Sequence, residues 1–428
     1  MSTPIEAPIT YLNKVRMAPF RALLVAMILV AWSTCLFAEN WPAWRGPDGN
    51  GVVDNTDLPL RWSRTEGVHW RTPLPEPGNS TPVVWGDRVF VTQSIGTRRS
   101  LLCFHRADGR ELWSAGIEVL HPERRWADAP YCAPSPSTDG DRVICWFGSG
   151  GLICYDLDGR ELWRLDLGRH DHVFGYGSSP VLHGDTCYLN FGPGEREFLI
   201  AVDKHTGKER WRRAPPVAGG DNIHGTWSTP LLVRTQAGTE LISCLRGELA
   251  GLDPDSGQVR WFTGLYGIQS KTSPVAGEGV VVLSGDKGSS EIAARLGGSG
   301  DITESHVLWR RHPPHPRVGT GVIHQGHYYG VRAAGLADCL DLRTGEVIWA
   351  ARLRGDGGNA LIWSSPLLAG DRLYVSNQSG DTFIIRAAPR FELIAVNSLG
   401  EEINASAVPS GRQILLRTHE ALWCLGDP

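Results

Sequence analysis

The residues best suited to chemistry are histidines that gather in a few segments between apolar runs. His170-Asp171-His172 presents two imidazoles, and His121 or His224 from neighbouring segments could complete a metal site. No two of these histidines have a rigid helical spacing such as H-x-x-x-H, and a solvent-exposed polar loop explains them as well. A metal-assisted hydrolase is therefore one alternative function.

The same segments are rich in tryptophan, tyrosine and arginine, which together with histidine suit a binding surface. Aromatic and arginine side chains are enriched at the centres of protein interfaces. A paired-carboxylate glycosidase or a Ser-His-Asp hydrolase has no marker in the sequence, so we assign no catalytic, cofactor-binding or metal-binding residue. We predict instead a docking face that includes His121, Arg125, Trp126, Tyr131, His170, His172, Tyr176, Asn222, His224, Trp227, His315 and Arg317.

Eight of the nine cysteines follow residue 38, and their positions suggest packing rather than metal binding. Cys103, Cys154, Cys339 and Cys424 fall at one position of an internal repeat, the position that Ala201, Gly251 and Ala395 fill elsewhere. A buried cysteine behaves as a small apolar residue, and no C-x-x-C pair is present. Cys145 and Cys154 are expected to lie opposite each other across a hairpin, either as a packed thiol pair or as a disulfide.

The element that positions these segments is a repeat, clearest in residues 177–211. A Ser-Ser-Pro turn, an apolar strand, a His-Gly-Asp turn and two further strands lead to a tight turn at Asp203–Gly207 and a last strand that ends at Trp211. Four short strands separated by turns form one antiparallel meander. Repeats of 40–50 residues of this kind are typical of propeller blades.

Eight copies of the opening turn can be aligned, at Ser80, Ser135, Ser178, Ser228, Thr272, Gly319, Ser364 and Ala405. The last copy stops before its fourth strand, and an orphan strand at about 68–74 carries Trp70. We predict an all-β protein, an eight-bladed propeller of four-stranded antiparallel blades, whose ring closes when strand 68–74 completes the C-terminal blade. Closure removes open sheet edges. The repeat tryptophans are Trp70, Trp113, Trp163, Trp211, Trp261, Trp309 and Trp349.

The repeat resembles that of the pyrroloquinoline quinone (PQQ) propeller family, whose hallmark is A-x-D-x-x-T-G-x-x-x-W. Ala201-Val-Asp203-Lys-His-Thr206-Gly207-Lys-Glu-Arg-Trp211 matches it fully, and residues 339–349 match except for Cys339. The resemblance covers nearly all of residues 40–428. These motif residues are structural: glycine permits the turn, aspartate caps it, and tryptophan packs between blades.

The resemblance implies two kinds of function. Quinoprotein dehydrogenases of the family hold the quinone over a calcium ion, usually under a disulfide between adjacent cysteines. This sequence has no adjacent cysteines and no calcium-ligand set that we can place. Other members, such as the BamB-like propellers, bind no cofactor and dock proteins. The chain looks most like secreted propellers of planctomycete-type bacteria, so we expect a non-catalytic docking protein without a cofactor. A PQQ-dependent dehydrogenase with calcium is the other alternative.

The N-terminal region reads as an export signal followed by a connecting segment. Residues 1–38 carry Lys14, Arg16 and Arg21, then an apolar stretch at 22–32 and a cleavage pattern ending at Ala38. An uncleaved anchor remains an alternative, and the residues before Cys35 make a poor lipidation signal. Residues 39–67 are predicted to be a strap whose Trp41 and Trp44 pack on the propeller rim, with a ligand lip as the other interpretation. The propeller spans 68–428.

The negative net charge of the chain argues against one class of partner, nucleic acids. The whole chain has a formal net charge of −4, and residues 1–38 hold three basic residues and Glu6, so the remainder is −4 − 2 = −6. Nucleic-acid binding requires a basic face, so no nucleic-acid partner is expected. We expect an exported monomer, periplasmic or extracellular, that contacts a membrane only through an uncleaved signal.

Overall fold

The structure, a computed structural model, describes residues 1, 40–120, 123, 130–217, 225–265, 269–285 and 290–426. Apart from Met1, all of them belong to the compact unit Glu39–Pro428. Strands dominate this unit, and the one helical turn among the described residues is η1 (Gly148–Gly150). No described helix has the length and apolar character required to cross a membrane.

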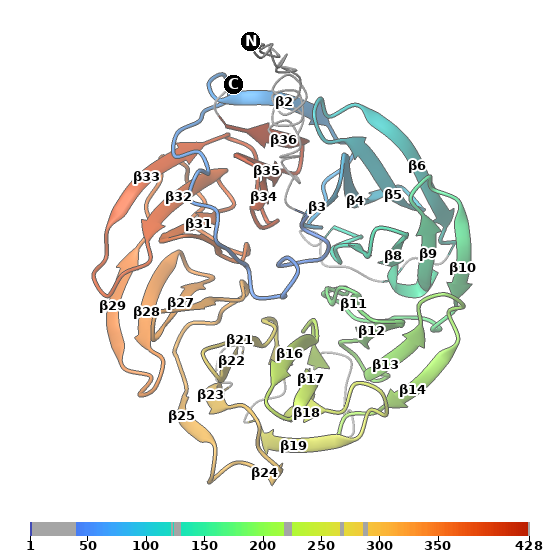
Figure 1. Cartoon of the computed structure of the whole chain (residues 1–428), viewed down its shortest axis with the longest axis vertical. Helices are drawn as coiled ribbons and strands as arrows, with labels where there is room; N and C mark the ends of the chain where they lie inside the picture. Colours follow the sequence, from blue (N-terminus) through green and yellow to red (C-terminus); the bar gives the residue numbers. More distant parts are fainter. Residues whose placement is uncertain are drawn as a thin grey trace. The chain divides into compact units, whose positions relative to one another are not determined.

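Eight of the nine sheets among the described residues are blades arranged in a ring, so the predicted eight-bladed propeller is confirmed (Figure 1). Each blade is antiparallel and runs from an innermost to an outermost strand. In blades 1 to 4 the strands are β3 (Val83–Trp85), β4 (Arg88–Ile95), β5 (Arg98–His105) and β6 (Glu111–Glu118); β7 (Ser137–Thr138), β8 (Arg142–Trp146), β9 (Leu152–Asp156) and β10 (Glu161–Leu165); β11 (Val181–His183), β12 (Thr186–Phe191), β13 (Phe198–Asp203) and β14 (Glu209–Arg213); β16 (Leu231–Thr235), β17 (Gly238–Leu245), β18 (Glu248–Leu252) and β19 (Val259–Gly264).

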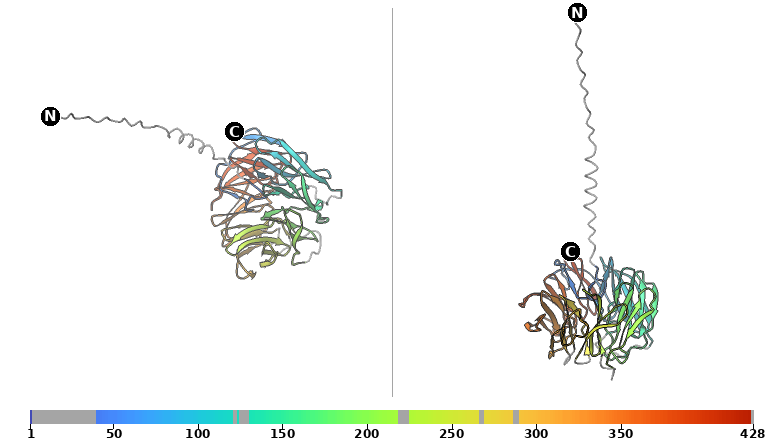
Figure 2. Two further views of the ribbon diagram at one scale, coloured as in Figure 1. Left: turned by 45° about the vertical axis from the view of Figure 1, so that its right-hand side comes forward. Right: turned by 60° about the horizontal axis from the view of Figure 1, so that its bottom comes forward.

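Blades 5 to 8 repeat this order, and Figure 2 shows the ring from two other directions. Their strands are β21 (Val275–Gly277), β22 (Val280–Ser284), β23 (Glu291–Arg295) and β25 (Val307–Arg311); β26 (Val322–His324), β27 (His327–Arg332), β28 (Leu336–Asp341) and β29 (Val347–Arg352); β30 (Leu367–Ala369), β31 (Arg372–Ser376), β32 (Asp381–Arg386) and β33 (Leu393–Ser398); β34 (Val408–Ser410), β35 (Gln413–Arg417), β36 (Ala421–Leu425) and β2 (Val68–Pro73). Four short strands are added to this frame: β1 (Val52–Val53), β15 (Gly225–Thr226), β20 (Gln269–Ser270) and β24 (Gly300–Asp301).

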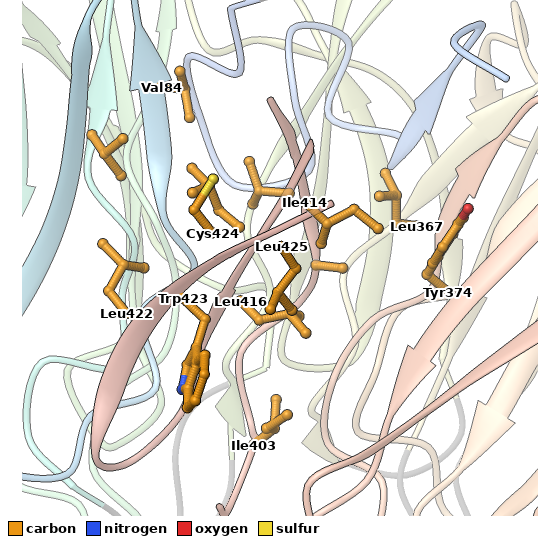
Figure 3. Packing of buried hydrophobic residues seen from close by; sticks show 14 of the residues in the cluster. Val84, Leu367, Tyr374, Ile403, Ile414, Leu416, Leu422, Trp423, Cys424 and Leu425 are labelled. Carbon is orange, nitrogen blue, oxygen red and sulfur yellow. The ribbon is translucent and has the colours of Figure 1, made fainter. Parts of the chain in front are cut away.

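The ring closes as predicted, because β2 pairs antiparallel with β36, and Trp70 lies opposite Cys424. The two ends of the propeller therefore share the sheet of blade 8. A core of buried residues from blades 1, 7 and 8 surrounds this closure, and Figure 3 shows Trp423, Cys424 and Leu425 packed within it. Arg417 adds polar contacts across the joint, donating to the Thr92 carbonyl at 2.7 Å and to Gln93 Oε1 at 2.7 Å.

A second closure encircles the central channel at the start of the innermost strands. In each blade a main-chain N–H donates to a serine or threonine hydroxyl of the next blade, at 2.8–3.2 Å. The eight hydroxyls form a complete circle that returns from blade 8 to blade 1. We call it the hydroxyl ring: Thr81, Ser135, Ser179, Thr229, Ser273, Thr320, Ser365 and Ser406.

The repeat tryptophans join neighbouring blades at the outer strands. Trp163 Nε1 donates to the Lys204 carbonyl of blade 3 at 2.8 Å. The turn requires glycine at position 207 for two reasons: the Trp163 ring leaves no room for a side chain there, and φ is +70°. Trp70, Trp113, Trp211, Trp309 and Trp349 likewise donate to a carbonyl of the following blade. Trp261 differs, because it donates to Glu240 of its own blade.

The cysteines are buried and unpaired among the described residues, and their register explains why. Cys103, Cys154 and Cys339 lie opposite the repeat tryptophans Trp113, Trp163 and Trp349, where only a small side chain fits. Cys145 faces Ile153 and not Cys154, so the expected opposition is wrong by one residue and the two thiols occupy opposite sheet faces. The register of Ala395 was also wrong: it lies in the outermost strand β33, opposite Ile384, where other blades carry the tryptophan.

The strap, predicted for residues 39–67 and described from Asn40, does not pack on the rim. From Asn40 it crosses the central mouth of the ring and then passes outward to β2 (Figure 1). Trp41 exchanges two main-chain hydrogen bonds with Val84 of blade 1, and β1 pairs in parallel with β30 of blade 7. Burial of Trp41 beside the innermost strands, rather than at the periphery, is what draws the strap inward.

Candidate functional site

The innermost strands define two mouths of the channel. Each of these strands starts at the hydroxyl ring and ends at the hairpin to the second strand, so the two landmarks lie at opposite ends. The strap contacts the hairpin end, as at Gly86, Gly370 and Gly411. The connections between blades reach the hydroxyl-ring end. The described parts of the connections between blades therefore surround the mouth that the strap does not cover.

This mouth opens into a cavity of about 440 Å³, which we call the funnel. Seven of the eight ring hydroxyls line it, and a second layer lies two residues before each ring position. All eight residues of this second layer line the funnel: Asn79, Ala133, Gly177, Trp227, Lys271, Val318, Trp363 and Asn404. Each blade thus contributes one variable side chain at one position, just as the repeat dictates.

Aromatic side chains dominate one side of the funnel and its floor. Tyr131, Phe174, Tyr176 and Trp227 project from the connections into blades 2, 3 and 4, and Trp363 lies across from them in blade 7. Phe174 is 41% exposed, which is high for a ring of that size. Trp44 of the strap borders both this cavity and the one on the strap side, so it forms the floor between them.

Polar side chains on the other side are tied into a small network. The His419 ring lies 3.1 Å from Asn79 Oδ1 and 3.1 Å from Asn404 Nδ2, and Asn404 Oδ1 accepts from Gln378 Nε2 at 2.8 Å. Burial lowers the pKa of His419. Both His419 contacts involve the one ring atom Nε2, which can bond to only one of the two amides at a time, whereas Gln378 and Glu402 hold the Asn404 amide in a fixed orientation. Lys271 supplies the cationic group of the described lining.

Of the histidines considered as metal ligands from the sequence, the two that the structure describes, His170 and His172, do not line the funnel. His170 is 1% exposed and its ring packs edge-on against Trp146, Tyr176 and Phe191, at centroid distances of 5.5–5.8 Å. Burial lowers its pKa to about 4. His172 is fully buried 5.1 Å from the Trp227 ring, and its Nδ1 accepts from the Phe174 N–H. Both rings support the aromatic wall from behind.

The remaining predicted residues divide into three groups. Tyr131, Tyr176 and Trp227 line the funnel, with the Arg99 guanidinium 3.9 Å from the Tyr131 ring and Tyr176 only 4% exposed. His315 is exposed, beside the funnel residue Pro316. Arg317 is buried and therefore not part of an exposed face. His121, Arg125, Trp126, Asn222 and His224 lie outside the described residues.

Arg317 anchors the funnel wall from below. It donates to Glu291 at 2.7 Å and to Asp338 at 2.9 Å, and Arg332 reaches Asp338 at 2.7 Å. The two carboxylates raise the pKa of Arg317 above its usual value, even though burial alone would lower it. Its chain neighbours Pro316 and Val318 line the funnel, so this ion network fixes their position.

A second buried carboxyl lies behind Trp227. Glu197 accepts from the Thr226 hydroxyl at 2.7 Å, and its other oxygen is 3.7 Å from Arg246. Burial raises the pKa of Glu197 to about 7.

The sequence carried a signal for the residues we missed: Trp44 stands out by type, and Lys271, Trp363, Asn79 and Asn404 hold the same repeat position as Trp227. Phe174 carries no such signal.

Solved structures of similar fold include BamB and quinoprotein-type dehydrogenases. BamB from Moraxella catarrhalis superimposes with a TM-score of 0.58 at 13% identity, covering 82% of this chain and 95% of that one. A europium-containing methanol dehydrogenase gives 0.65 at 11% identity, with 90% of both chains covered. Quinohemoprotein alcohol dehydrogenase from Comamonas testosteroni gives 0.64 at 12% identity, covering 91% and 81%. These likenesses establish the fold alone.

The described funnel residues do not fit a calcium-bound quinone. Calcium requires six to eight oxygen ligands, with carboxylates prominent among them. The described lining contains no carboxylate, imidazole or thiol, and its hydroxyls already accept the hydrogen bonds of the ring. Around the rest of the described chain, no group of three or more His, Cys, Asp or Glu residues is placed to hold a metal ion.

Sequence comparisons match this chain to an outer membrane protein assembly factor. The outer membrane protein assembly factor BamB of Yersinia pestis is 21% identical over 233 residues, which are 50% of this chain and 55% of that protein. The chain thus matches about half the length of this curated relative. The family model for outer membrane protein assembly factor BamB matches residues 52–116, 97–351 and 234–425, almost the whole propeller. The chain therefore belongs to the BamB family of PQQ-like β-propellers.

Proposed function

We propose that this protein is an exported, non-catalytic propeller that docks a partner protein at the funnel. The observation that carries the proposal is the second layer of the funnel, in which two tryptophans, a lysine and two asparagine amides converge, with no carboxylate, imidazole or thiol in the described lining. General acid–base catalysis uses histidine most often, and the described lining has none. A protein interface instead uses aromatic anchors surrounded by polar groups.

The partner is expected to insert an apolar projection into the funnel. A cavity of about 440 Å³ suits a small group of side chains. Trp227, Phe174 and Trp363 would contact it, and Asn79 and Asn404 would bind its main-chain groups. An envelope polymer is the competing occupant. Relatives named for outer membrane assembly favour a protein.

Site-specific photocrosslinking tests the proposal. A photoreactive phenylalanine analogue at Trp363 should yield a protease-sensitive adduct in the envelope, and the same analogue at Phe262 should not. Phe262 is a matched control because it is 37% exposed on the outermost strand of blade 4. An adduct that resists protease but yields to a glycan-degrading enzyme would favour the polymer. Equal adducts at both positions would overturn the funnel as the docking site.

Export and the absence of a cofactor belong to the same proposal and need separate tests. N-terminal sequencing of the protein from its native host should begin at Glu39, whereas an intact N-terminus would favour the anchor. Titration with pyrroloquinoline quinone and calcium should leave tryptophan fluorescence unquenched, although Trp44, Trp227 and Trp363 all line the funnel. Saturable quenching together with dye reduction would replace the docking proposal with the dehydrogenase. Elemental analysis showing stoichiometric bound metal would favour the hydrolase.

A further inference from the structure

The innermost strand of each blade turns one set of main-chain groups toward the channel. In blade 3, His183 pairs with Thr186 across a two-residue turn, so Leu182 opposite Cys187 directs its N–H and C=O away from β12. The pairing registers place Leu232, Ala276, Ile323, Val84, Leu368 and Pro409 in the same way. We call these the inward-facing residues. Each has a hydrogen-bond donor and acceptor facing the channel, except proline, which lacks the donor.

The strap satisfies these groups in three blades. Val84 N–H and C=O both bond to Trp41 at 2.9 Å, Thr138 N–H of blade 2 donates to Pro42 at 2.8 Å, and Leu368 N–H donates to Gly51 at 2.9 Å. Blade 8 needs no partner for an N–H, because its inward-facing residue is Pro409. The strap thus acts as an added strand along one arc of the ring, from blade 7 to blade 2.

The opposite arc has no such cover. Leu182, Leu232 and Ala276 are partly exposed, whereas Val84 and Leu368 are 0% exposed. Their inward-facing N–H groups have no main-chain partner among the described residues. All three line a cavity of about 640 Å³ beside strap residues 46–50. Exposed main-chain groups at a sheet edge form a template for an additional strand.

We propose that the inner edges of blades 3, 4 and 5 bind an extended segment of a partner protein as an added strand. The chain itself supplies the pattern for that segment, since Gly51, Val52 and Val53 pair with blade 7 through main-chain bonds. The groove continues the strap interface, because strap residues form one of its walls. Apolar side chains such as Val233 and Leu296 form other parts of its lining. The site lies at the mouth opposite the funnel and is independent of the function proposed there.

Proline substitutions test this groove, because they remove the inward-facing N–H and leave the bonds to the second strand intact. The probe is a fluorescent peptide, Gly-Asn-Gly-Val-Val-Asp, which copies residues 49–54. Binding measured by anisotropy should weaken at least tenfold in Leu232→Pro and in Ala276→Pro. Pro409 in blade 8 shows that the ring accepts proline at this position.

Ile323→Pro is the matched control, because Ile323 faces inward in blade 6 but does not line the groove. Its peptide affinity should equal that of the unaltered protein. Hydrogen exchange provides a measurement that needs no variant: the peptide should protect the amides of Leu182, Leu232 and Ala276 and leave that of Ile323 unchanged. Equal affinity in all proline variants, no binding at millimolar peptide, or protection confined to blade 7 would each overturn the proposal.

Discussion

The two mouths of the channel use the same eight innermost strands in opposite ways. At the strap mouth the chain fills part of its own opening, and the inner edges of blades 1, 2 and 7 have main-chain partners in the strap. At the funnel the hydroxyl ring is satisfied internally, but the layer above it presents tryptophan, lysine and amide side chains to the cavity. The contrast is that the strap fills part of one mouth with the chain's own main-chain bonds, whereas the funnel leaves side chains of different types and sizes facing an open cavity.

Each mouth depends on a buried arginine, and the two arginines are balanced differently. Arg45 of the strap donates to the carbonyls of Asn50, Thr320 and Gly321 at 2.5–2.9 Å. No carboxylate pairs with it among the described residues, and burial lowers its pKa to about 9. Arg317 below the funnel instead meets two carboxylates. Substitutions at these positions therefore separate the two mouths energetically.

The largest effect is expected for Arg317→Met. Removing the cation leaves Glu291 and Asp338 buried without their main partner, which costs about 3–5 kcal/mol. Urea unfolding should measure this loss. Arg386→Met is the control, since its partners Asp371 and Glu392 are exposed and such pairs contribute about 1 kcal/mol or less. Similar losses in both variants would contradict the assigned role of the ion network.

A pH effect should follow on the funnel side, from Glu197. Its folded pKa of about 7 exceeds the unfolded value of 4.5, so the folded state binds the extra proton between these pH values. Stability from this group is therefore present at low pH and is lost as the pH rises from about 4.5 to 7. The loss should approach about 3 kcal/mol by linkage. The difference in unfolding free energy between the unaltered protein and Glu197→Gln, measured across this range, reports it.

His170 gives the opposite slope and serves as the control for that measurement. Its folded pKa of about 4 lies below the unfolded 6.5, so stability is lost as the pH falls through this window. His170→Phe should remove that loss, with the difference from the unaltered protein growing toward pH 4. Slopes of the same sign in the two variants would contradict the burial of one of these groups.

A smaller effect is expected at the strap mouth, from Arg45→Met. The substitution leaves carbonyl oxygens without donors but no uncompensated charge, so the cost should be about 1–3 kcal/mol. Hydrogen exchange should then accelerate at the amides of Val84 and Leu368, which the strap protects. Unchanged exchange would mean that the strap is held by other contacts, such as the pairing of β1 with β30.

The smallest stability effect should come from the funnel itself. Trp363 is partly exposed, so Trp363→Ala should cost less than the roughly 3–5 kcal/mol lost when a fully buried tryptophan is truncated. Partner binding should fall at least tenfold. Trp163→Ala, which removes an inter-blade contact, should show the reverse pattern. A large loss of stability at Trp363 would assign the funnel layer to folding instead.

The repeat allowed the fold to be predicted because its turns and tryptophans have a fixed spacing. The Ser-Thr-Pro openings, the Asp203–Gly207 turn and the orphan strand around Trp70 all have one geometric solution, a closed ring. Register was less secure: Cys145 and Ala395 were each misplaced because the blades differ in hairpin length. A shift of one residue moves a side chain to the other face of the sheet.

The site could be predicted only in part. The aromatic residues in the segments between blades indicated the correct end of the channel, since Tyr131, Tyr176 and Trp227 do line the funnel. It could not show that His170, His172 and Arg317 turn inward, because burial of a loop residue depends on tertiary contacts that the local sequence does not encode. Lys271 and Trp363 were accessible in principle, because they occupy the repeat position of Trp227.

The second layer of the funnel has a consequence for how this protein can change. It consists of one residue from each blade, in the order Asn, Ala, Gly, Trp, Lys, Val, Trp and Asn from blade 1 to blade 8. The hydroxyls two residues later join neighbouring blades by hydrogen bonds to main-chain N–H groups, and these bonds do not involve the second-layer side chains. The side chains that line the funnel can therefore change in one blade at a time, and such substitutions leave the hydrogen bonds that join the blades in place.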